Sequence, residues 1–361
     1  MVKVPQATYR VQLHPGFTLE DAAGITPYLS DLGVSHLYAS PYLQAAPGSA
    51  HGYDVVDPGR VNMELGGEKG HRRLCLALDE MGLGQILDVV PNHMAISGPE
   101  NRWWWDVLEN GPSSPYASYF DVDWSSPKNR MKNKILLPIL GNHYGRVLES
   151  GDIRLVCEKG WFTIRCYEHS LPVDPRSLAD ILRRVAGRSE SDRLWFLSDS
   201  LEGLPYSSVT DQSGVHRRHI SCSVIRSYLQ ELLEQEKEIA SVLHEVLDEI
   251  NTNPDLLNNL LEQQNYRVAF WRTAAQDLDY RRFFDINSLV GVRVEEEKVF
   301  THTHELILKW LREGILDGLR IDHPDGLRDP ERYLRRLREA SPDAWIVVEK
   351  ILQPDEVRAA V

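Results

Sequence analysis

Cysteine is scarce in this sequence, and its few copies are not arranged for metal or disulfide chemistry. Four cysteines occur among 361 residues, at Cys75, Cys157, Cys166 and Cys222. None belongs to a CxxC pair or to a Cys/His spacing typical of zinc sites. Cys157 and Cys166 could meet across a hairpin, but we expect four reduced thiols, because a chain of this length needs no disulfides for stability.

Long apolar runs and an excess of positive charge are also absent. No stretch approaches the length of a membrane span, and the opening residues MVKVPQATYR lack the apolar core of a signal peptide. We therefore expect a cytoplasmic protein with no membrane partner. The 40 lysines and arginines against 53 aspartates and glutamates give a net charge of −13. That balance argues against nucleic acid as a partner, because binding phosphates requires a basic face.

The composition is that of a folded globular chain. Hydrophobic residues make up 42% and charged residues 26% of the sequence, which is enough apolar material for a substantial core. The length by itself suits either two domains or one large barrel.

Strand and helix patterns alternate near both ends of the chain. Before residue 100 a capping box at Thr18 and Asp21 predicts a helix that Pro27 interrupts, and a second helix is expected over 68–81. After residue 300, Asp329-Pro330 predicts another helix start. The expected strands are ATYRVQL, VSHLYASPYL, GQILDVVP, GILDGLRIDH and DAWIVVEKIL. This order is typical of parallel βαβ units.

The middle of the chain breaks this alternation. It contains a predicted hairpin turning at Lys159-Gly160 and a long charged helix over roughly 221–250. The simplest α/β architecture is a (β/α)8 TIM barrel, incomplete here with about five strands, and with a large, mostly helical insertion after strand 3. The expected divisions are strands 1–3 in 1–93, the insertion in 94–299 and strands 4–5 in 300–361. A doubly wound sheet is the competing fold.

Polar residues stand at the ends of three expected strands, where an apolar strand would simply stop. A carboxylate within a buried strand is costly unless it is paired or hydrogen-bonded. At the carboxyl-terminal rim of a barrel the same residue commonly serves chemistry. The residues in question are Asp88, Asn92 and His93 after the third strand, Arg320, Asp322 and His323 at the fourth, and Glu349 at the fifth.

Asp322 and Glu349 follow successive strands, so we expect them side by side. Neighbouring carboxyl groups allow one to stay ionised while the pKa of the other rises, which suits the nucleophile and the acid/base of glycosidic-bond chemistry. Arg320, two residues before Asp322, could keep it ionised. For a single carboxylate a structural ion-pair network would be the better interpretation, but three polar strand ends together favour a catalytic site.

These residues lie in segments that resemble a known superfamily. DVVPNH, GLRIDH and VVEK resemble the first three signature segments of the α-amylase superfamily, and HGYDVVD resembles its sugar-contacting segment. A closer resemblance is to the maltooligosyl trehalose synthase family. It is carried by ATYRVQLHPGFT, HLYASPYLQAAPGSAHGYDVVDP, YRRFFDINSLVGVRVE and RIDHPDGLRDP, and it extends over essentially the whole chain.

The resemblance implies a role for each residue of the carboxylate group. Asp322 would be the nucleophile that attacks the anomeric carbon. Glu349 would be the general acid and then the base. Arg320 and Asp88 would orient the nucleophile. The family needs no organic cofactor and no metal for this chemistry.

The resemblance also implies the residues that bind a maltooligosaccharide substrate. Tyr53 and His93 would contact the sugar in the cleaved subsite, Tyr53 by stacking on its ring. Asp54 and Asn92 would support the geometry of their loops. His323 would lie on the acceptor side.

One part of the superfamily pattern has no counterpart here. Its third rim carboxylate belongs to a fourth segment, whereas this sequence reaches Val361 shortly after the fifth expected strand. We therefore expect the N-terminal portion of such an enzyme, without strands 6–8 and inactive alone.

The activity that the resemblance implies converts the reducing-end α-1,4 bond of maltooligosaccharides to an α,α-1,1 bond. The alternatives are a hydrolase of α-glucans or maltooligosyl trehalose, and a non-catalytic glucan-binding fragment. Nothing in the sequence indicates the oligomeric state.

Other features have both a functional and a structural interpretation. The tryptophans at 103–105 could form a sugar platform, but at least one should lie in the core. His302 and His304 could suggest a metal pair, although a solvated or capping role before a helix is favoured. Three charged residues could line the cleft or form structural salt bridges: Arg281, Arg282 and Asp285.

Overall fold

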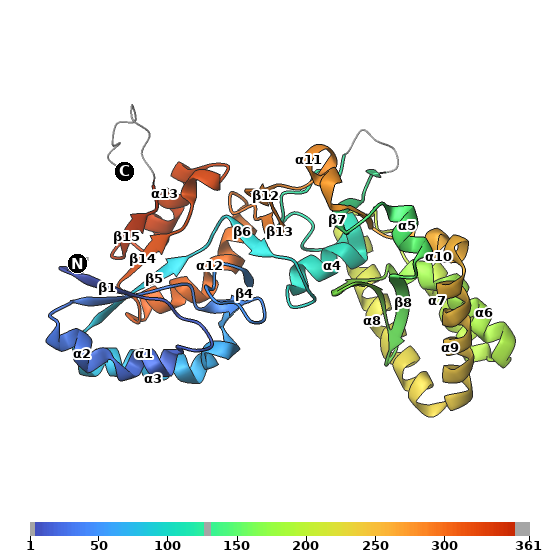
Figure 1. Ribbon diagram of the computed structural model, residues 1–361, viewed down its shortest axis with the longest axis horizontal. Helices are drawn as coiled ribbons and strands as arrows, with labels where there is room; N and C mark the ends of the chain where they lie inside the picture. The colour runs from blue at the N-terminus through green and yellow to red at the C-terminus, as the bar shows by residue number, and fades with distance from the viewer. Residues whose placement is uncertain (1–3, 126–130, 351–361) are drawn as a thin grey trace. The chain divides into compact units, whose positions relative to one another are not determined.

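The computed structural model describes residues 4–125 and 131–350, which form two compact units. Unit 1 combines Met1–Ile96 with Arg282–Val361, and unit 2 is Ser97–Arg281 (Figure 1). Unit 2 is shorter than the expected insertion over 94–299, because residues on both sides of it pair with each other in a sheet of unit 1.

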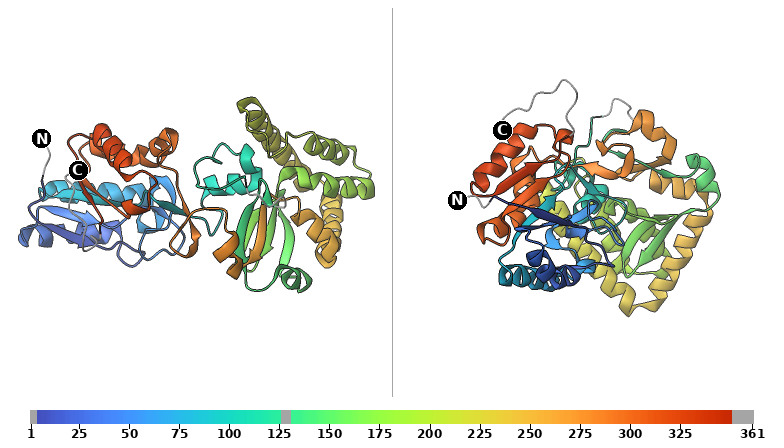
Figure 2. Two further views of the ribbon diagram at one scale, coloured as in Figure 1. Left: turned by 90° about the horizontal axis from the view of Figure 1, so that it is seen from above. Right: turned by 60° about the vertical axis from the view of Figure 1, so that its left-hand side comes forward.

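Unit 1 is built on a five-stranded parallel sheet. Its strands are β1 (Thr8–Val11), β2 (His36–Ala39), β5 (Gly84–Val89), β14 (Gly318–Ile321) and β15 (Trp345–Val348). They lie side by side in chain order, so strands from the two ends of the sequence, blue and orange-red in Figures 1 and 2, are neighbours. A doubly wound sheet would reverse its strand order at a switch point, and this sheet does not.

Unit 1 has five α-helices among its described residues, and the starts predicted at Thr18, at residue 68 and at Asp329 are confirmed to within one residue. The helices are α1 (Leu19–Gly24), α2 (Thr26–Asp31), α3 (Gly67–Glu80), α12 (Glu297–Arg312) and α13 (Pro330–Ala340). The Thr18 backbone N–H donates to Asp21 at 2.8 Å in the predicted capping box. The helix breaks at Ile25, before Pro27, because proline cannot donate the next helical hydrogen bond. Asp329 accepts from the backbone N–H of Arg332 and begins α13.

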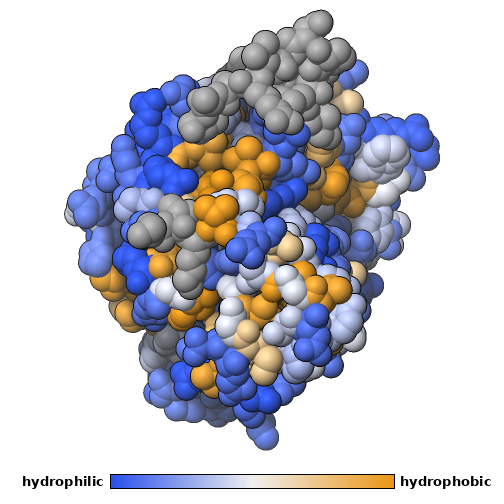
Figure 3. Space-filling model, turned by 90° about the vertical axis from the view of Figure 1, so that its left-hand side faces the viewer, coloured by the Kyte–Doolittle hydropathy of each residue, from blue (hydrophilic) through white to orange (hydrophobic). Residues whose placement is uncertain are grey.

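The core of unit 1 lies along the central strands. Leu37, Leu87 and Leu319 are fully buried, as expected for strands covered on both faces. β15 lies at one edge of the sheet, and its Val348 is 40% exposed. Figure 3 shows apolar patches among hydrophilic residues on one face of the molecule.

Two small antiparallel sheets follow the strand ends of unit 1. One pairs β3 (Leu43–Ala45) with β4 (Val55–Val61), both in the chain that follows β2. The other has the order β12-β13-β6, formed by β12 (Arg282–Phe283), β13 (Ile286–Gly291) and β6 (His93–Ala95). Because β6 follows β5 directly, this sheet extends the loops at the carboxyl ends of the parallel strands.

Unit 2 combines two sheets with a set of helices. Strands β8 (Ile153–Glu158), β9 (Trp161–Cys166) and β10 (His169–Pro172) are antiparallel, and β7 (Ile135–Leu140) pairs with β11 (Tyr266–Phe270). The predicted hairpin turn is confirmed, since Lys159 and Gly160 have φ values of 52° and 79°. The helices are α4 (Arg102–Asn110), α5 (Tyr144–Glu149), α6 (Ala179–Ser189), α7 (Asp192–Glu202), α8 (Gln212–Gln235), α9 (Lys237–Thr252), α10 (Pro254–Leu261) and α11 (Ala274–Asp277).

The single long helix expected over 221–250 is wrong. The structure has two helices, α8 and α9, which meet at Glu236 with φ −113° and ψ 89°. The apolar period continues on both sides of this residue, so the pattern alone does not reveal the break. Arg193 of α7 pairs with the Glu236 carboxylate at 2.9 Å.

Strand register and burial test the expectations for the cysteines and the tryptophans. All four cysteines are free thiols, and Cys166 lies opposite Ile153 rather than Cys157. Trp104 is buried in the core of unit 2, whereas Trp103 stacks on Tyr116. Among residues 4–125 and 131–350, no helix combines the length and apolarity needed to cross a membrane.

The expected position of the two histidines before a helix is wrong. Both lie inside α12, and His304 is buried, with its Nε2 2.8 Å from the Tyr333 hydroxyl. Burial lowers the pKa of His304 to about 4, so it is a neutral core residue. His302 is exposed on the same helix.

A buried ion pair holds unit 2 together. Arg218 on α8 is fully buried and donates to Asp174 at 3.0 Å, to Asn110 at 2.9 Å and to the carbonyl of Pro205 at 2.7 Å. Asp174 also accepts from Asn265 at 3.2 Å. One guanidinium therefore joins four separate segments of the unit.

Arg218→Met should destabilise unit 2 strongly, because it leaves the Asp174 charge buried and unpaired. We expect the free energy of unfolding to fall by about 3–5 kcal/mol in urea denaturation followed by circular dichroism. The control is Arg188→Ala, which removes the exposed pair with Glu249 and should leave the free energy of unfolding nearly unchanged. Equal losses in the two variants would contradict this account.

Candidate active site

Four charged side chains lie together at the carboxyl ends of β5, β14 and β15. The register places Arg320 opposite Asp88. Backbone hydrogen bonds continue past the strands, from Asp322 to the Val89 carbonyl at 2.8 Å and from Glu349 to the Ile321 carbonyl at 2.9 Å. Parallel strands in register thus bring polar strand ends from distant parts of the sequence to one edge of the sheet.

The Arg320 guanidinium contacts all three carboxylates of this group. Its Nη1 donates to Asp88 at 2.8 Å and to Asp322 at 2.6 Å, and its Nη2 lies 3.2 Å from the Glu349 carboxylate. The planar fork of arginine suits this arrangement, because its donors point in fixed directions. The three anions outnumber the one cation, so the cluster keeps excess negative charge.

Asp88 is the innermost carboxylate and the best satisfied. Its side chain is fully buried and also accepts hydrogen bonds from the hydroxyls of Tyr38 at 2.8 Å and Tyr53 at 2.6 Å. Burial and the nearby negative charge raise the pKa of Tyr38 to about 12. Burial, together with the bond to Asp88, also raises the pKa of Tyr53. Both phenols therefore stay protonated and donate to Asp88.

Asp322 differs from its neighbours in how burial affects its charge. Burial raises its pKa to about 6, against the opposing influence of Arg320, while the other two carboxylates add to the increase. We expected Arg320 to keep Asp322 ionised; it acts in that direction, but burial has the larger effect. The Glu349 side chain is more open, at 39% exposed, and accepts the backbone N–H of His323 at 2.9 Å.

The segment carrying Tyr53 and Asp54 is ordered by local hydrogen bonds. The Asp54 carboxylate accepts from the Ser49 hydroxyl and lies 3.8 Å from Nδ1 of His51. The Tyr53 carbonyl lies 3.2 Å from Nε2 of His93. Asp54 thus holds the turn that directs Tyr53 toward Asp88. Stacking of Tyr53 on a sugar ring stays a prediction.

His93 and Asn92 lie beneath the surface. Both are about 1% exposed, and their side-chain nitrogens are 3.4 Å apart. The ring of Phe283 covers His93, with the two ring centroids 4.3 Å apart. A direct contact between His93 and a sugar stays a prediction.

His323 has an unusual backbone at the same rim. Its φ of 42° and ψ of 53° are left-handed, a conformation that non-glycine residues rarely adopt. This conformation directs its N–H at the Glu349 carboxylate. The following turn needs Gly326, because a Cβ there would lie 2.5 Å from the His323 ring.

Residues at the end of β1 join the site and were missed from the sequence. Arg10 donates to the Tyr53 hydroxyl at 3.2 Å and to Gln12 at 3.1 Å. Gln12 donates in turn to the His51 carbonyl at 3.2 Å. The alternation of polar residues along ATYRVQL was a usable signal for this face of the strand.

Two phenylalanines in the β12–β13 hairpin were also missed as site residues. Phe284 is 70% exposed and has a φ of 48°, a left-handed conformation that costs about 1–2 kcal/mol in a residue other than glycine. Its ring and that of Phe283 lie 5.3 Å and 5.1 Å from the His323 ring.

The charged residues around this hairpin form structural salt bridges. Arg282 donates to Asp285 at 2.6 Å and to the Asn287 side chain. In unit 2, Arg281 donates to Asp121 at 3.0 Å. Within the described chain, no group of three or more His, Cys, Asp or Glu side chains is arranged to hold a metal ion.

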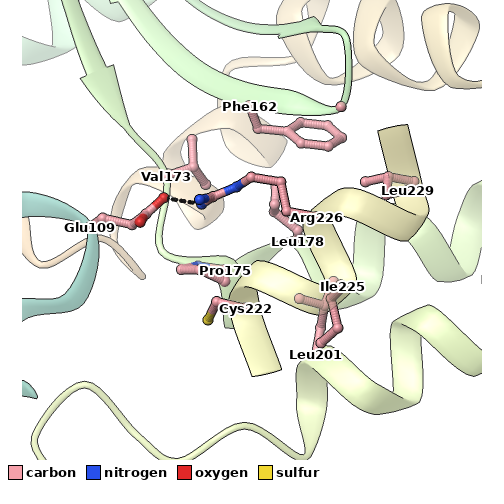
Figure 4. Close-up of a pocket in the computed structure, with 11 residues that line it drawn as sticks. Glu109, Phe162, Val173, Pro175, Leu178, Leu201, Cys222, Ile225, Arg226 and Leu229 are labelled. Carbon is pink, nitrogen blue, oxygen red and sulfur yellow. Dashed lines mark hydrogen bonds and ion pairs between the residues drawn. The ribbon is translucent and has the colours of Figure 1, made fainter. Parts of the chain in front are cut away.

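Unit 2 has a pocket of a different kind. It lies between β9, α7 and α8 and is lined by apolar side chains around an ion pair between Glu109 and Arg226 (Figure 4). Burial raises the pKa of Glu109, and the guanidinium carbon of Arg226 lies 3.9 Å from the centre of the Trp161 ring. Its volume of about 30 Å³ holds roughly one water molecule, so it is too small for a sugar.

Comparisons with known proteins show which families this chain resembles. Residues 18–146 match the α-amylase catalytic domain. The putative maltooligosyl trehalose synthase of Mycobacterium tuberculosis is 37% identical over 97% of this chain and 35% of its own length. Among solved structures, maltooligosyltrehalose synthase from Arthrobacter ramosus is 36% identical with a TM-score of 0.69, covering 98% of this chain and 36% of its own.

A hypothetical maltooligosyl trehalose synthase from Sulfolobus tokodaii is 31% identical with a TM-score of 0.66, covering 99% of this chain and 37% of its own. The chain spans about a third of the length of each of these relatives. Over that length, this chain is a homologue of the maltooligosyl trehalose synthases, and it contains part of an α-amylase catalytic domain.

Proposed function

We propose that these residues serve an intramolecular transglycosylation. In this reaction the reducing-end α-1,4 bond of a maltooligosaccharide becomes an α,α-1,1 bond, which gives a maltooligosyl trehalose. The proposal is carried by one observation, the Arg320 guanidinium that holds Asp88, Asp322 and Glu349 together at adjacent strand ends. The similarity to maltooligosyl trehalose synthases supports the choice of reaction.

The first displacement uses the two outer carboxylates. Asp322 attacks the anomeric carbon while Glu349 donates its proton to the leaving oxygen, so that the sugar becomes an ester of Asp322 and a glucose is freed. Retaining glycosidases keep these two carboxyl groups only about 5–5.5 Å apart. A single guanidinium that contacts both carboxylates favours such a short separation.

The second displacement decides the product. The freed glucose turns over, and its 1-hydroxyl attacks the anomeric carbon of the intermediate. The ester bond to Asp322 breaks and Glu349 takes the proton. Two inversions retain the α configuration. Water attacking at the same point would give hydrolysis instead, so the glucose must stay bound and water must be excluded.

Asp88 fixes the geometry of this pair without joining the chemistry. Its carboxylate is buried beneath Arg320 and receives both tyrosine hydroxyls. Arg320 is thereby anchored through Nη1, which also donates to Asp322, and its Nη2 lies beside Glu349. Tyr53 links this anchor to the segment that we propose to contact the sugar, together with Asp54, His93 and His323.

A hydrolase of α-glucans or of maltooligosyl trehalose is the second candidate, because the same pair of carboxylates serves hydrolysis. The 39% exposure of Glu349 is the observation in its favour, since water reaches that carboxylate. The chain covers 35% of its Mycobacterium tuberculosis relative, and we expect the 361 residues alone to turn over little.

Product analysis separates the two candidates. With maltopentaose, the protein as the cell makes it should give a non-reducing pentasaccharide ending in trehalose, detected by chromatography and loss of reducing ends. Shorter reducing sugars as the only products would contradict the isomerisation.

Asp322→Asn should lower the rate of this reaction by about 10³-fold or more, since it removes the nucleophile. Asp325→Asn, which alters only the outer pair with Lys350, is the control.

Stability should depend on pH through Asp322. Its folded-state pKa of about 6 exceeds the value for an unfolded chain, so ionised Asp322 destabilises the fold above pH 6 and this cost disappears toward pH 4. Asp322→Asn should therefore raise the melting temperature at pH 8, and the gain should shrink as the pH falls through 6. Asp88→Asn should lower it, because Asp88 is fully hydrogen-bonded. A melting temperature for Asp322→Asn at or below wild type at pH 8 would contradict this.

A further inference from the structure

An exposed aromatic ring stands beside the candidate acid/base residue in unit 1. Phe284 lies at the tip of the β12–β13 hairpin, and its ring centroid is 5.3 Å from that of His323. The backbone N–H of His323 binds the Glu349 carboxylate at 2.9 Å. Phe284 is thus two contacts away from the group proposed to protonate the leaving oxygen.

The surroundings of Phe284 do not explain its exposure. The ring is 70% exposed, and one side of it rests against the edge of Phe283, with centroids 4.5 Å apart. Its backbone is left-handed, where asparagine, aspartate or glycine would be the usual residue. Backbone strain of this kind clusters at binding and active sites, where the surrounding structure holds it in place.

The hairpin holds this ring in a defined place. Arg282 ties the tip together through Asp285 and Asn287. β13 in turn pairs with β6, which follows directly from the strand that carries Asp88. The ring is therefore presented by the same sheet framework that positions the carboxylates.

We propose that Phe284 is the surface on which the glucose on the leaving-group side rests. The inference rests on the proposed function and assigns the residue that holds the freed glucose. An aromatic face attracts the apolar face of a pyranose without directional hydrogen bonds. The freed glucose can therefore rotate on this ring, so that its 1-hydroxyl replaces its 4-hydroxyl next to the anomeric carbon of the intermediate. The bound glucose also keeps water away from the ester of Asp322.

The test measures how the covalent intermediate is divided between glucose and water. Maltopentaose is given to the protein as the cell makes it, and free glucose is measured against trehalose-ended product. Phe284→Ala and Phe284→Gly should raise the ratio of glucose to trehalose-ended product about 10-fold. Phe284→Trp, which keeps a larger aromatic face, should stay near the wild-type ratio.

Folding is controlled in the same experiment. Glycine adopts the left-handed backbone without strain, so Phe284→Gly should melt no lower than wild type, and its change in product ratio then reflects the lost ring. Phe196→Ala removes a ring that is similarly exposed, at 66%, but lies in unit 2, and it should leave the ratio unchanged.

The outcomes separate this inference from the proposed function. A wild-type protein that forms trehalose-ended product, with Phe284→Ala and Phe284→Gly giving the same ratio as wild type, would overturn the inference alone. A wild-type protein that releases only reducing sugars would overturn the proposed function, and the inference with it. A higher ratio in both variants, with Phe284→Trp and Phe196→Ala unchanged, would support the role of the ring.

Discussion

The contact of one guanidinium with three carboxylates is the constraint on which the rest of the site depends. Without Arg320, Asp88 would be a buried charge supported only by two phenols, and Asp322 and Glu349 would repel each other at adjacent strand ends. Parallel pairing of β5, β14 and β15 supplies the spacing that lets one side chain reach all three. The parallel pairing of these strands thus positions the side chains of the site as well as those of the core.

The same cluster is consistent with the proposed role of Asp322 as a nucleophile near neutral pH. Burial strips water from its carboxylate and raises its pKa to about 6, while Arg320 limits that rise. The Asp322 carboxylate is ionised above pH 6 but poorly hydrated, and a poorly hydrated carboxylate attacks the anomeric carbon more readily. Glu349 lies farther out and is held by the His323 backbone, an exposed position that suits its proposed role as acid and base.

Much of this arrangement could be predicted from sequence, because it follows from local rules. Apolar runs ending in polar residues predicted the strands and the cluster of polar side chains at their carboxyl ends, and caps at Thr18 and Asp329 predicted helix starts. The break at Glu236 could not be predicted, since the apolar period continues through it. Nor could the cover of His93 by Phe283, because it depends on a hairpin brought from nearly two hundred residues away. The pKa of Asp322 depends on burial, which a motif does not report.

The central claim is that Asp322 forms a covalent bond to the sugar. The most direct test is to trap that bond with a 5-fluoro-α-glucosyl fluoride, which forms the ester readily and releases it slowly, and to map the modified peptide by mass spectrometry. The account predicts one added glycosyl group on Asp322, and none in Asp322→Asn. A label on another carboxylate, or steady turnover with no label on Asp322, would contradict it.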